Sequence, residues 1–280
     1  MKKTNLKKRI LVVVFAVVIF LLAVFSALGL GTWGSANLWE HWRPTYAKVD
    51  ISPLLQKSSL SDEDYATLYR QTGVTRLGVD ELRSAGDERQ LLTIQSAYFG
   101  QYDVTRSKFG PYTYIENLSR NIPTVNLRNG DILLSASTYF SFFRFGHSVM
   151  VVDAEYGRII ESFSPGTFSQ LSSYSSVTGL SNLIVVRPKC DEATRAAVAA
   201  YAKNHLLGIP YSLTTGIFSK KYTEEIPKET QCTHVVWYAY KKHGIDLDSN
   251  GGLVVKPQDI ARSNQVEVLQ VFGFNPEKLW

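Results

Sequence analysis

A long apolar run lies near the amino end of the chain, between residues 10 and 30. These 21 residues carry no charge, and only Ser26 and Gly29 interrupt the aliphatic and aromatic side chains. A bilayer core about 30 Å thick needs roughly 20 helical residues, so the pattern predicts a membrane-spanning helix. A secretory signal usually has an apolar stretch of about 7–15 residues, which favours an uncleaved anchor. The alternative is cleavage after Gly29 or Ala36, where small residues are suitably spaced, and secretion of the remainder.

Charge gives this helix a direction. The chain has 30 basic and 25 acidic residues, a formal net charge of +5, and residues 1–9 contain five of the basic ones. The positive-inside rule therefore predicts a cytoplasmic segment 1–9, an anchor 10–30 and a single-pass protein with everything later outside the cytoplasm. Residues 10–280 have 25 basic and 25 acidic residues, so we expect no nucleic-acid surface. An aromatic belt at the outer membrane interface is expected from three residues: Trp33, Trp39 and Trp42.

Two segments follow the anchor. Residues 31–60 contain Pro44, Pro53 and a pair of serines, and are interpreted as a tether. Residues 61–125 are interpreted as helical, because Ser61 followed by three acids is typical of a capped helix start and Gly73 of a helix end. A further pattern from Asp80 to Phe99 predicts two helical pieces broken at Gly86. This helical segment is expected to serve in packing or spacing, with a regulatory lid as the alternative.

The pattern changes from residue 126 onward. Short apolar runs are separated by turn signals such as Asn129-Gly130, which predicts antiparallel hairpins. The predicted strands are 131–135, 147–152, 158–163 and 183–187, and the predicted helices are 191–206 and 231–243. We therefore expect an α+β domain at 126–280 with helices packed on an antiparallel sheet.

Only two cysteines are present, which excludes a disulfide-rich scaffold. Thr230 is a plausible N-cap, and this would place Cys232 in the first turn of a helix, where free N–H groups favour the thiolate. Cys190 is followed by Asp191 and Glu192, whose charges disfavour a thiolate. Cys232 is therefore the better candidate nucleophile. A buried structural thiol and a disulfide between the two cysteines are the alternatives.

A cysteine nucleophile needs a base and a group that orients the base. His147 begins a predicted strand, and Glu161 lies on the return strand of the same hairpin. Side chains alternate along strands, so the two share a face when the connection has the right parity. Structural roles for this pair are the alternative. The other histidines are expected in the tether (His41), at helix ends (His205 and His243) or turned away from the cysteine (His234).

A zinc site is a further alternative, with Cys232, His234 and His147 as ligands. Zinc sites usually contain Cys-x-x-Cys or paired histidine spacings, which are absent here, so we expect no metal and no other cofactor.

Taken in order, several short motifs resemble the circularly permuted NlpC-type papain-like cysteine hydrolases, the YiiX/YebB-like group. They are Asn129-Gly130-Asp131-Ile132-Leu133, Gly146-His147-Ser148-Val149, Ile160-Glu161-Ser162, Gly208-Ile209-Pro210-Tyr211-Ser212 and Gln231-Cys232-Thr233. The resemblance covers roughly residues 126–265. Its histidine strand precedes the cysteine helix, which is the reverse of the order in ordinary papain-like enzymes.

The resemblance implies a permuted papain-like fold and a role for each matching residue. Cys232 would be the nucleophile, His147 the base, Glu161 the orienting acid, and Tyr211 an aromatic that lines the site. Thr233-His234 departs from the small or aliphatic residues commoner in the family. The implied reaction is hydrolysis of an amide bond through a thioacyl intermediate, with cell-wall peptides (peptidoglycan) as an expected substrate. A thiol-dependent lipid acyltransferase or esterase and an inactive module that binds a wall component or partner are the alternatives.

Overall fold

The computed structural model describes residues 2–38, 41–108, 113–141 and 143–279. The helices are α1 (Lys2–Leu38), α2 (Ser52–Leu55), α3 (Asp62–Thr72), α4 (Arg76–Ala85), α5 (Gln90–Tyr98), α6 (Ser175–Thr178), α7 (Glu192–His205), α8 (Cys232–Lys242) and α9 (Pro257–Ala261). The strands are β1 (Val104–Lys108), β2 (Thr113–Leu118), β3 (Ile132–Ser135), β4 (Thr138–Phe140), β5 (His147–Asp153), β6 (Arg158–Glu161), β7 (Gln170–Ser173), β8 (Leu183–Pro188) and β9 (Val266–Phe272).

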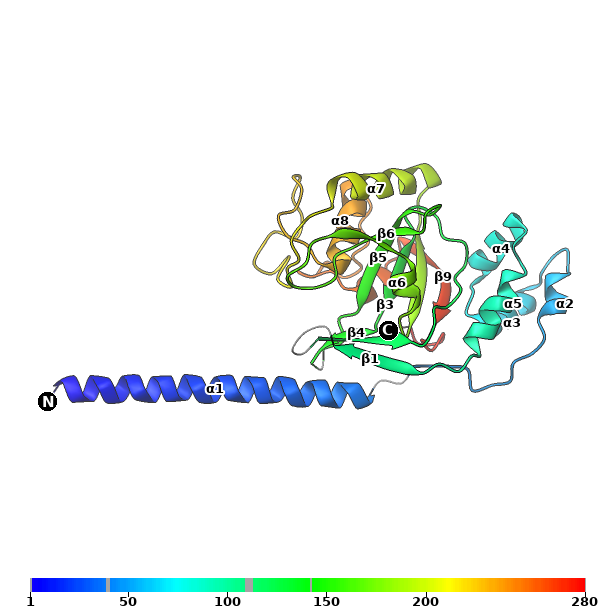
Figure 1. Ribbon diagram of the computed structural model, residues 1–280. Helices are drawn as coiled ribbons and strands as arrows, with labels where there is room; N and C mark the ends of the chain where they lie inside the picture. Colours follow the sequence, from blue (N-terminus) through cyan, green and yellow to red (C-terminus); the bar gives the residue numbers. More distant parts are fainter. Residues whose placement is uncertain (1, 39–40, 109–112, 142, 280) are drawn as a thin grey trace.

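Helix α1 extends away from the rest of the protein (Figure 1). Its apolar part, Lys7–Gly31, has 25 residues, or about 37 Å at about 1.5 Å per residue, which is enough to cross a membrane. Trp33 is largely exposed, like most of the apolar residues of α1. Trp42 differs from the expectation of an aromatic belt, because its ring packs on Tyr98 of the helical segment. Trp39 lies outside the described residues.

Six antiparallel strands form the central sheet, in the order β7-β6-β5-β3-β8-β9. This confirms the α+β class with antiparallel strands that the hairpin pattern predicted. The predicted strands and helices after residue 126 all exist, with ends that differ by at most two residues from those expected.

The two faces of the sheet pack on different layers. On one face, Ile132, Leu134 and Met150 belong to a core that includes residues of α7 and α8. On the other face, Leu133 and Val149 belong to a core shared with α3, α4 and α5. Adjacent strand residues therefore point into opposite cores, as the period of two requires. Figure 1 shows α7 and α8 on one side of the sheet and α3–α5 on the other.

The helical segment forms as its capping signals predict. Ser61 and Asp64 make a capping box at the start of α3, and Gly73 ends the helix in the left-handed conformation with φ 71°. Gly86 separates α4 from α5, as expected. Residues 61–125 also contain β1 and β2, which the sequence pattern did not predict, and these pair with β4 in a three-stranded sheet.

The expected tether is not a free linker where the structure describes it. Ile51 is fully buried in the core of the helical segment. The side chain of Gln95 donates to the carbonyl of Val49 at 2.8 Å. These contacts pack residues 41–60 along α3 and α5, because apolar residues at positions such as 51 gain more from burial than a solvated linker would allow.

A buried ion cluster joins the helical segment to the sheet. Arg187 on β8 binds both carboxylate oxygens of Asp131 at 2.7 Å, and the same guanidinium bonds Glu81 on α4. The side chain of Asp131 is fully buried, so this bidentate pair replaces its lost hydration. Asp131 is the acid of the Asn129-Gly130-Asp131 motif, and its role here is structural.

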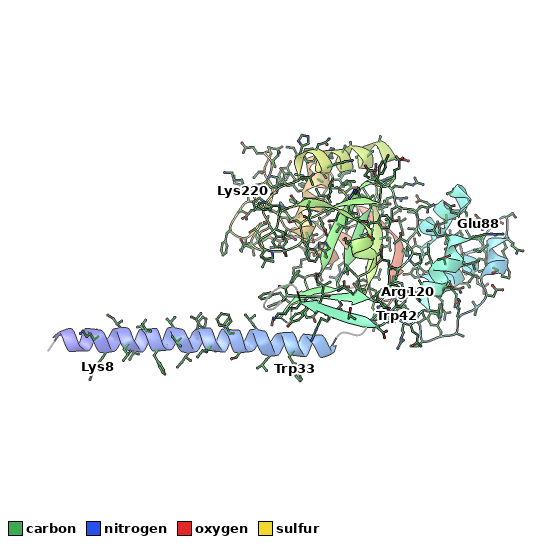
Figure 2. All side chains as sticks on the ribbon, in the orientation of Figure 1. Lys8, Trp33, Trp42, Glu88, Arg120 and Lys220 are labelled. Carbon is green, nitrogen blue, oxygen red and sulfur yellow. The ribbon has the colours of Figure 1, made fainter. Side chains whose placement is uncertain are left out.

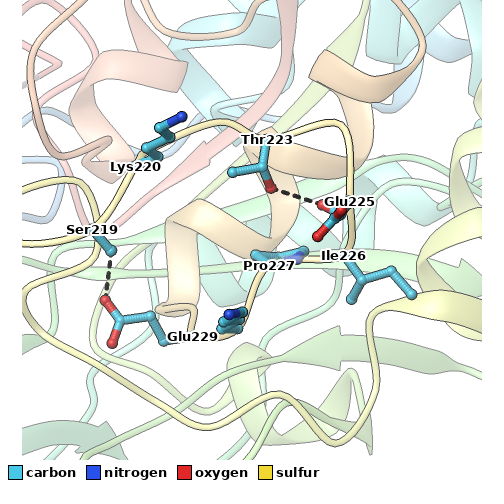
Figure 3. A pocket seen from close by; sticks show the side chains of 8 residues that line it. Ser219, Lys220, Thr223, Glu225, Ile226, Pro227 and Glu229 are labelled. Carbon is cyan, nitrogen blue, oxygen red and sulfur yellow. Dashed lines mark hydrogen bonds between the residues drawn. The ribbon is translucent and has the colours of Figure 1, made fainter.

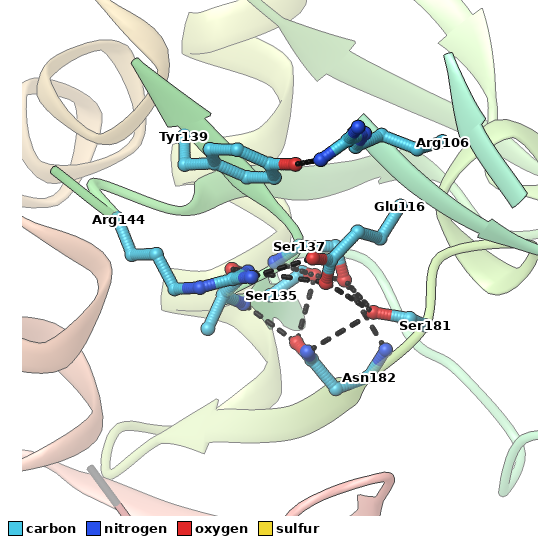
Figure 4. Close-up of polar contacts among 9 residues, drawn as sticks. Arg106, Glu116, Ser135, Ser137, Tyr139, Arg144, Ser181 and Asn182 are labelled. Carbon is cyan, nitrogen blue, oxygen red and sulfur yellow. Dashed lines mark hydrogen bonds and ion pairs between the residues drawn. The ribbon is translucent and has the colours of Figure 1, made fainter. Parts of the chain in front are cut away.

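A second polar cluster lies beneath the three-stranded sheet (Figure 4). Glu116 on β2 is buried and pairs with Arg144 at 2.5 Å. Ser181 donates to the same carboxylate at 3.2 Å and also contacts Ser137. The cluster connects β2 with the loops before β5 and β8, and it fixes the short segment that leads into His147.

Candidate active site

Cys232 lies in the first turn of α8, as expected, but it is the first residue of the helix and the N-cap is different. Gln231 has extended backbone angles (φ −141°, ψ 173°), and its side-chain oxygen accepts the backbone N–H of Thr233 at 2.9 Å. Thr230, the predicted cap, instead pairs with the ring of His234 at 2.8 Å. The N-cap differs from the predicted one because of a tertiary contact: Thr230 forms a β-bridge with Tyr211, which fixes its backbone.

The sulfur of Cys232 is almost completely buried, with 4% of the residue exposed. Burial alone would raise the pKa of the thiol. Hydrogen bonds from His147 and from the Ser148 backbone, together with the imidazolium charge, outweigh it and lower the pKa. The free N–H groups at the start of α8 favour the thiolate in the same way.

Gln231 opposes this effect to some extent. Its Oε1 atom lies 3.3 Å from the sulfur, and an acceptor oxygen disfavours a thiolate. The amide is held in this orientation, because Nε2 donates to the carbonyl of Val255 at 2.9 Å while Oε1 accepts from Thr233. The sulfur therefore has two acceptor oxygens near it, Gln231 Oε1 and the Gly146 carbonyl at 4.0 Å, besides the donors His147 and the Ser148 backbone.

His147 begins β5 and faces the cysteine. The register of β5 and β6, with Met150 opposite Ile160, places His147 diagonally across from Glu161 on one face. The Nε2 atom of His147 donates to Oε2 of Glu161 at 3.1 Å, so Nδ1 is the nitrogen left for the sulfur. The sheet therefore brings the three candidate residues together.

The imidazole is fully buried against its two partners. Burial lowers the pKa of His147, but the hydrogen bonds and charges of Cys232 and Glu161 outweigh it and raise the pKa to about 9. The pKa of His147 rises and that of Cys232 falls for the same reason, so the thiolate–imidazolium pair is favoured over the neutral pair. Phe163 packs edge-on against the ring with centroids 5.0 Å apart, which excludes water from it.

Glu161 ends β6 and is held on its other side. Ser172 on β7 donates to Oε1, while Oε2 faces His147. Burial favours the neutral acid, yet the bond and charge of His147 outweigh it and lower the pKa of Glu161. The carboxylate is therefore charged and oriented toward the imidazole.

Tyr211 lies beside the cysteine, as the motif suggested. Its backbone N–H donates to the carbonyl of Thr167 at 2.9 Å, which joins the loop before α8 to the loop after β6. Burial and then the nearby Cys232 charge raise the pKa of Tyr211 well above its ordinary value, so the phenol stays neutral.

The remaining candidates take no part in this arrangement. His234 accepts from Thr230 and donates to the Lys221 carbonyl at 2.8 Å, and burial lowers its pKa to about 4. His243 pairs with the Ala239 carbonyl near the end of α8. Cys190 is a free thiol, and its pKa is raised, mainly by burial. In the part of the chain that the structure describes, no three His, Cys, Asp or Glu side chains form a metal-binding group.

Two functional candidates were missed from the sequence. The backbone N–H of Ser148 reaches the sulfur, and the hydroxyl of Ser172 positions Glu161. Ser148 directly follows the histidine, so its position alone was a signal. Ser172 lies on β7, for which we had predicted no strand, so nothing indicated it.

A pocket of about 290 Å³ lies on the Glu161 side of the imidazole. Its wall is mixed: four apolar side chains (Ile115, Phe163, Val177 and Leu180) lie beside the catalytic candidates and four other polar residues (Asn117, Thr167, Gln170 and Ser176). A second pocket of about 280 Å³ is formed by residues 219–229 in the segment that leads to Cys232 (Figure 3). The first pocket adjoins two of the three candidate catalytic residues.

The fold and site thus define an α+β protein with an apolar N-terminal helix and a buried cysteine, histidine and glutamate in contact. Among curated proteins, the chain is similar to the uncharacterized protein YycO of Bacillus subtilis (strain 168), with 30% identity over 129 residues. The match covers 46% of this chain, and the chain spans about half the length of that relative. No family model matches the chain, and no solved structure matches it.

Proposed function

We propose that this protein is a membrane-anchored cysteine hydrolase that cleaves an amide bond through a thioacyl intermediate. The observation that carries the proposal is the contact of Cys232, His147 and Glu161 at the start of a helix. A nucleophile, a base and an orienting acid in this order have the geometry that thiol acyl transfer requires.

The fold that we propose is the permuted papain-like fold of the NlpC type. Its support is the chain order, in which the histidine strand β5 and the acid strand β6 precede the cysteine helix α8. The motifs of the sequence lie at the expected places, with Gly146-His147 entering β5 and Gln231-Cys232 entering α8. The similarity to YycO adds no function, because that relative is itself uncharacterized.

The reaction begins with attack of the Cys232 thiolate on the carbonyl carbon of the substrate. The developing oxyanion lies near the backbone N–H of Cys232, since the first N–H groups of a helix lack intrahelical acceptors. The imidazolium of His147 then gives its proton to the leaving amine, which departs with the C–N bond electrons. Next, His147 takes a proton from water, hydroxide attacks the thioester, and the acid leaves with regeneration of the thiolate. Glu161 holds the ring and stabilises its charged form throughout.

The five cations before the apolar run support a topology with residues 1–9 in the cytoplasm and the site outside. Peptides of a cell wall would be amide substrates within reach of a site on that side of the membrane. An anchored wall hydrolase is therefore the function we favour.

A second candidate is a thiol-dependent lipid esterase or acyltransferase. The observation that favours it is the apolar part of the pocket beside His147, formed by Ile115, Phe163, Val177 and Leu180, which suits an alkyl chain. In that reaction a lipid hydroxyl or amine would replace water in the second step.

The test is incubation of the full chain in nanodiscs with muropeptides and, separately, with acyl lipids, followed by mass spectrometry of the products. The expected result is a cleaved amide with wild type and none with Cys232→Ala, while Cys190→Ala retains activity. Cleavage that persists in Cys232→Ala would refute the mechanism. Products from acyl lipids alone would support the second candidate.

A further inference from the structure

Several large apolar side chains are exposed on two loops near the start of α8. Phe218 is 86% exposed and Leu253 is 68% exposed, and Leu213 and Ile217 are each about half exposed. We call these four residues the apolar rim. Single exposed apolar residues are common, but several together on neighbouring loops indicate a surface that another phase or molecule covers.

Backbone packing and an ion pair hold the two loops of the rim together. The backbone of Gly216 lies against the carbonyl of Leu253, so closely that a Cβ atom there would be only 1.9 Å from that oxygen. Lys221 donates to the Gly252 carbonyl at 2.6 Å and pairs with Asp248. The rim is therefore a built surface rather than two independent loop tips.

The outer end of the apolar helix contacts the same end of the protein. Ser141, in the turn after β4, donates to the carbonyl of Leu28 at 2.5 Å, three residues before the end of the apolar stretch at Gly31. From this turn the chain runs to Gly146, which is tied to the Thr138 carbonyl at 3.1 Å and lies against Cys232. The end of the sheet that carries His147 therefore lies next to the part of α1 that would emerge from a membrane.

The apolar rim lies on the side of the protein that contacts α1. The segment that contains three of the four rim residues runs from Tyr211, beside Cys232, back to Thr230, so both its ends lie at the start of α8. Figure 2 shows Lys220, two residues after Phe218, at the edge of the protein toward which α1 extends, and Glu88 at the opposite edge.

We propose that the apolar rim inserts into the outer leaflet of the membrane that α1 spans, and that it seats the catalytic end of the protein on the lipid surface. The inference is independent of the reaction proposed above. Amphipathic surfaces of this kind enter the boundary between headgroups and acyl chains by about 5–10 Å. The exposed ammonium of Lys220 beside the rim suits anionic headgroups. If the hydrolase function also holds, the substrates that reach Cys232 are those displayed at the membrane surface.

The test measures depth in the full chain, reconstituted as one copy per nanodisc of phosphatidylcholine and phosphatidylglycerol. A fluorophore is attached at Phe218→Cys in a background of Cys190→Ala and Cys232→Ala, and quenching by a shallow spin-labelled lipid is recorded. The matched control is Tyr156→Cys, because Tyr156 is an aromatic with 73% exposure in the turn at the far end of β5. Both positions are surface sites, so neither substitution removes a core contact.

We expect at least a fivefold greater quenching at position 218 than at position 156. A reporter at position 217 should lose that quenching when Phe218→Asp and Leu253→Asp are introduced. Equal quenching at 218 and 156 would overturn the proposal. The proposal would also be overturned, in favour of self-association, if the fluorophore at position 218 became buried only in discs that hold two copies of the chain and was not quenched by lipid in discs that hold one. Because the background lacks Cys232, none of these results depends on catalysis.

Discussion

Removal of the charge of Glu161 tests the electrostatics of the site most directly. In the structure, the pKa of His147 is about 9 against an ordinary value of 6.5. This rise is a net effect, in which the hydrogen bonds and charges of Cys232 and Glu161 more than offset the burial of the ring. Cys232 and Glu161 share this stabilisation of the imidazolium, and burial opposes it. A hydrogen bond to a charged group contributes about 1.5–3 kcal/mol. Removal of the Glu161 charge is therefore expected to lower the population of the thiolate–imidazolium pair by about tenfold or more.

The variant is Glu161→Gln, which keeps the shape of the side chain and one hydrogen-bond acceptor. The measurement is the rate at which iodoacetamide labels Cys232 between pH 5 and 10, in a Cys190→Ala background. The direction of the expected change follows from the coupling of the two groups. A less stable imidazolium raises the pKa of Cys232, so less thiolate is present near pH 7. In the wild type, Cys232 should already be labelled well below pH 9. In Glu161→Gln, labelling of Cys232 should be about tenfold slower near pH 7.

The control is Glu155→Gln, since Glu155 is an exposed acid in the turn at the far end of the same hairpin. It should leave the pH profile unchanged. If Glu161→Gln and wild type have the same profile, then Glu161 does not set the charge state of the pair, and the assignment of the orienting acid is wrong.

Three further predictions concern charge and packing. At pH 7 iodoacetamide should label Cys232 faster than Cys190, because the pKa of Cys232 is lowered and that of Cys190 is raised; equal rates, followed by peptide mass spectrometry, would contradict the activated thiol. Asp131→Asn should lower the free energy of unfolding by about 1–3 kcal/mol, since it replaces the bidentate carboxylate partner of Arg187 by a neutral amide while Glu81 still pairs with the guanidinium; denaturant titration measures this, and a change below about 0.5 kcal/mol would refute it. Gly146→Ala should cost about 2 kcal/mol, because φ is +72° and the new Cβ would lie 2.4 Å from a backbone oxygen; a thermal midpoint equal to that of wild type would contradict this.

Much of the local structure follows from short-range signals. The capping residues around Ser61 and Gly73, the break at Gly86 and the hairpin turns all predicted elements that the structure contains. Such signals act within a few residues, so they operate wherever the rest of the chain goes. Five of the strands that the structure describes were not predicted: β1, β2, β4, β7 and β9. In β1 and β7 the side chains are mostly exposed and show no alternation of apolar and polar residues, so no periodic signal marks them.

The capping of α8 shows where local signals fail. Thr230 and Gln231 both precede the helix, and propensity favours the threonine as a cap. Packing decided otherwise, because the Thr230 hydroxyl bonds to His234 and the residue is bridged to Tyr211. Gln231 then caps the helix and places its oxygen near the sulfur, a contact that propensity does not predict.

The sequence by itself determined the apolar helix with its cationic end, the α+β class, and the positions of Cys232 and His147 at the starts of a helix and a strand. Only the tertiary structure decided that these residues meet. Cys232 follows His147 by 85 residues, and their contact depends on the packing of α8 against β5, while the register of β5 with β6 brings Glu161 to His147. Register and helix packing depend on many distant side chains at once, whereas caps and periodicity are properties of neighbouring residues.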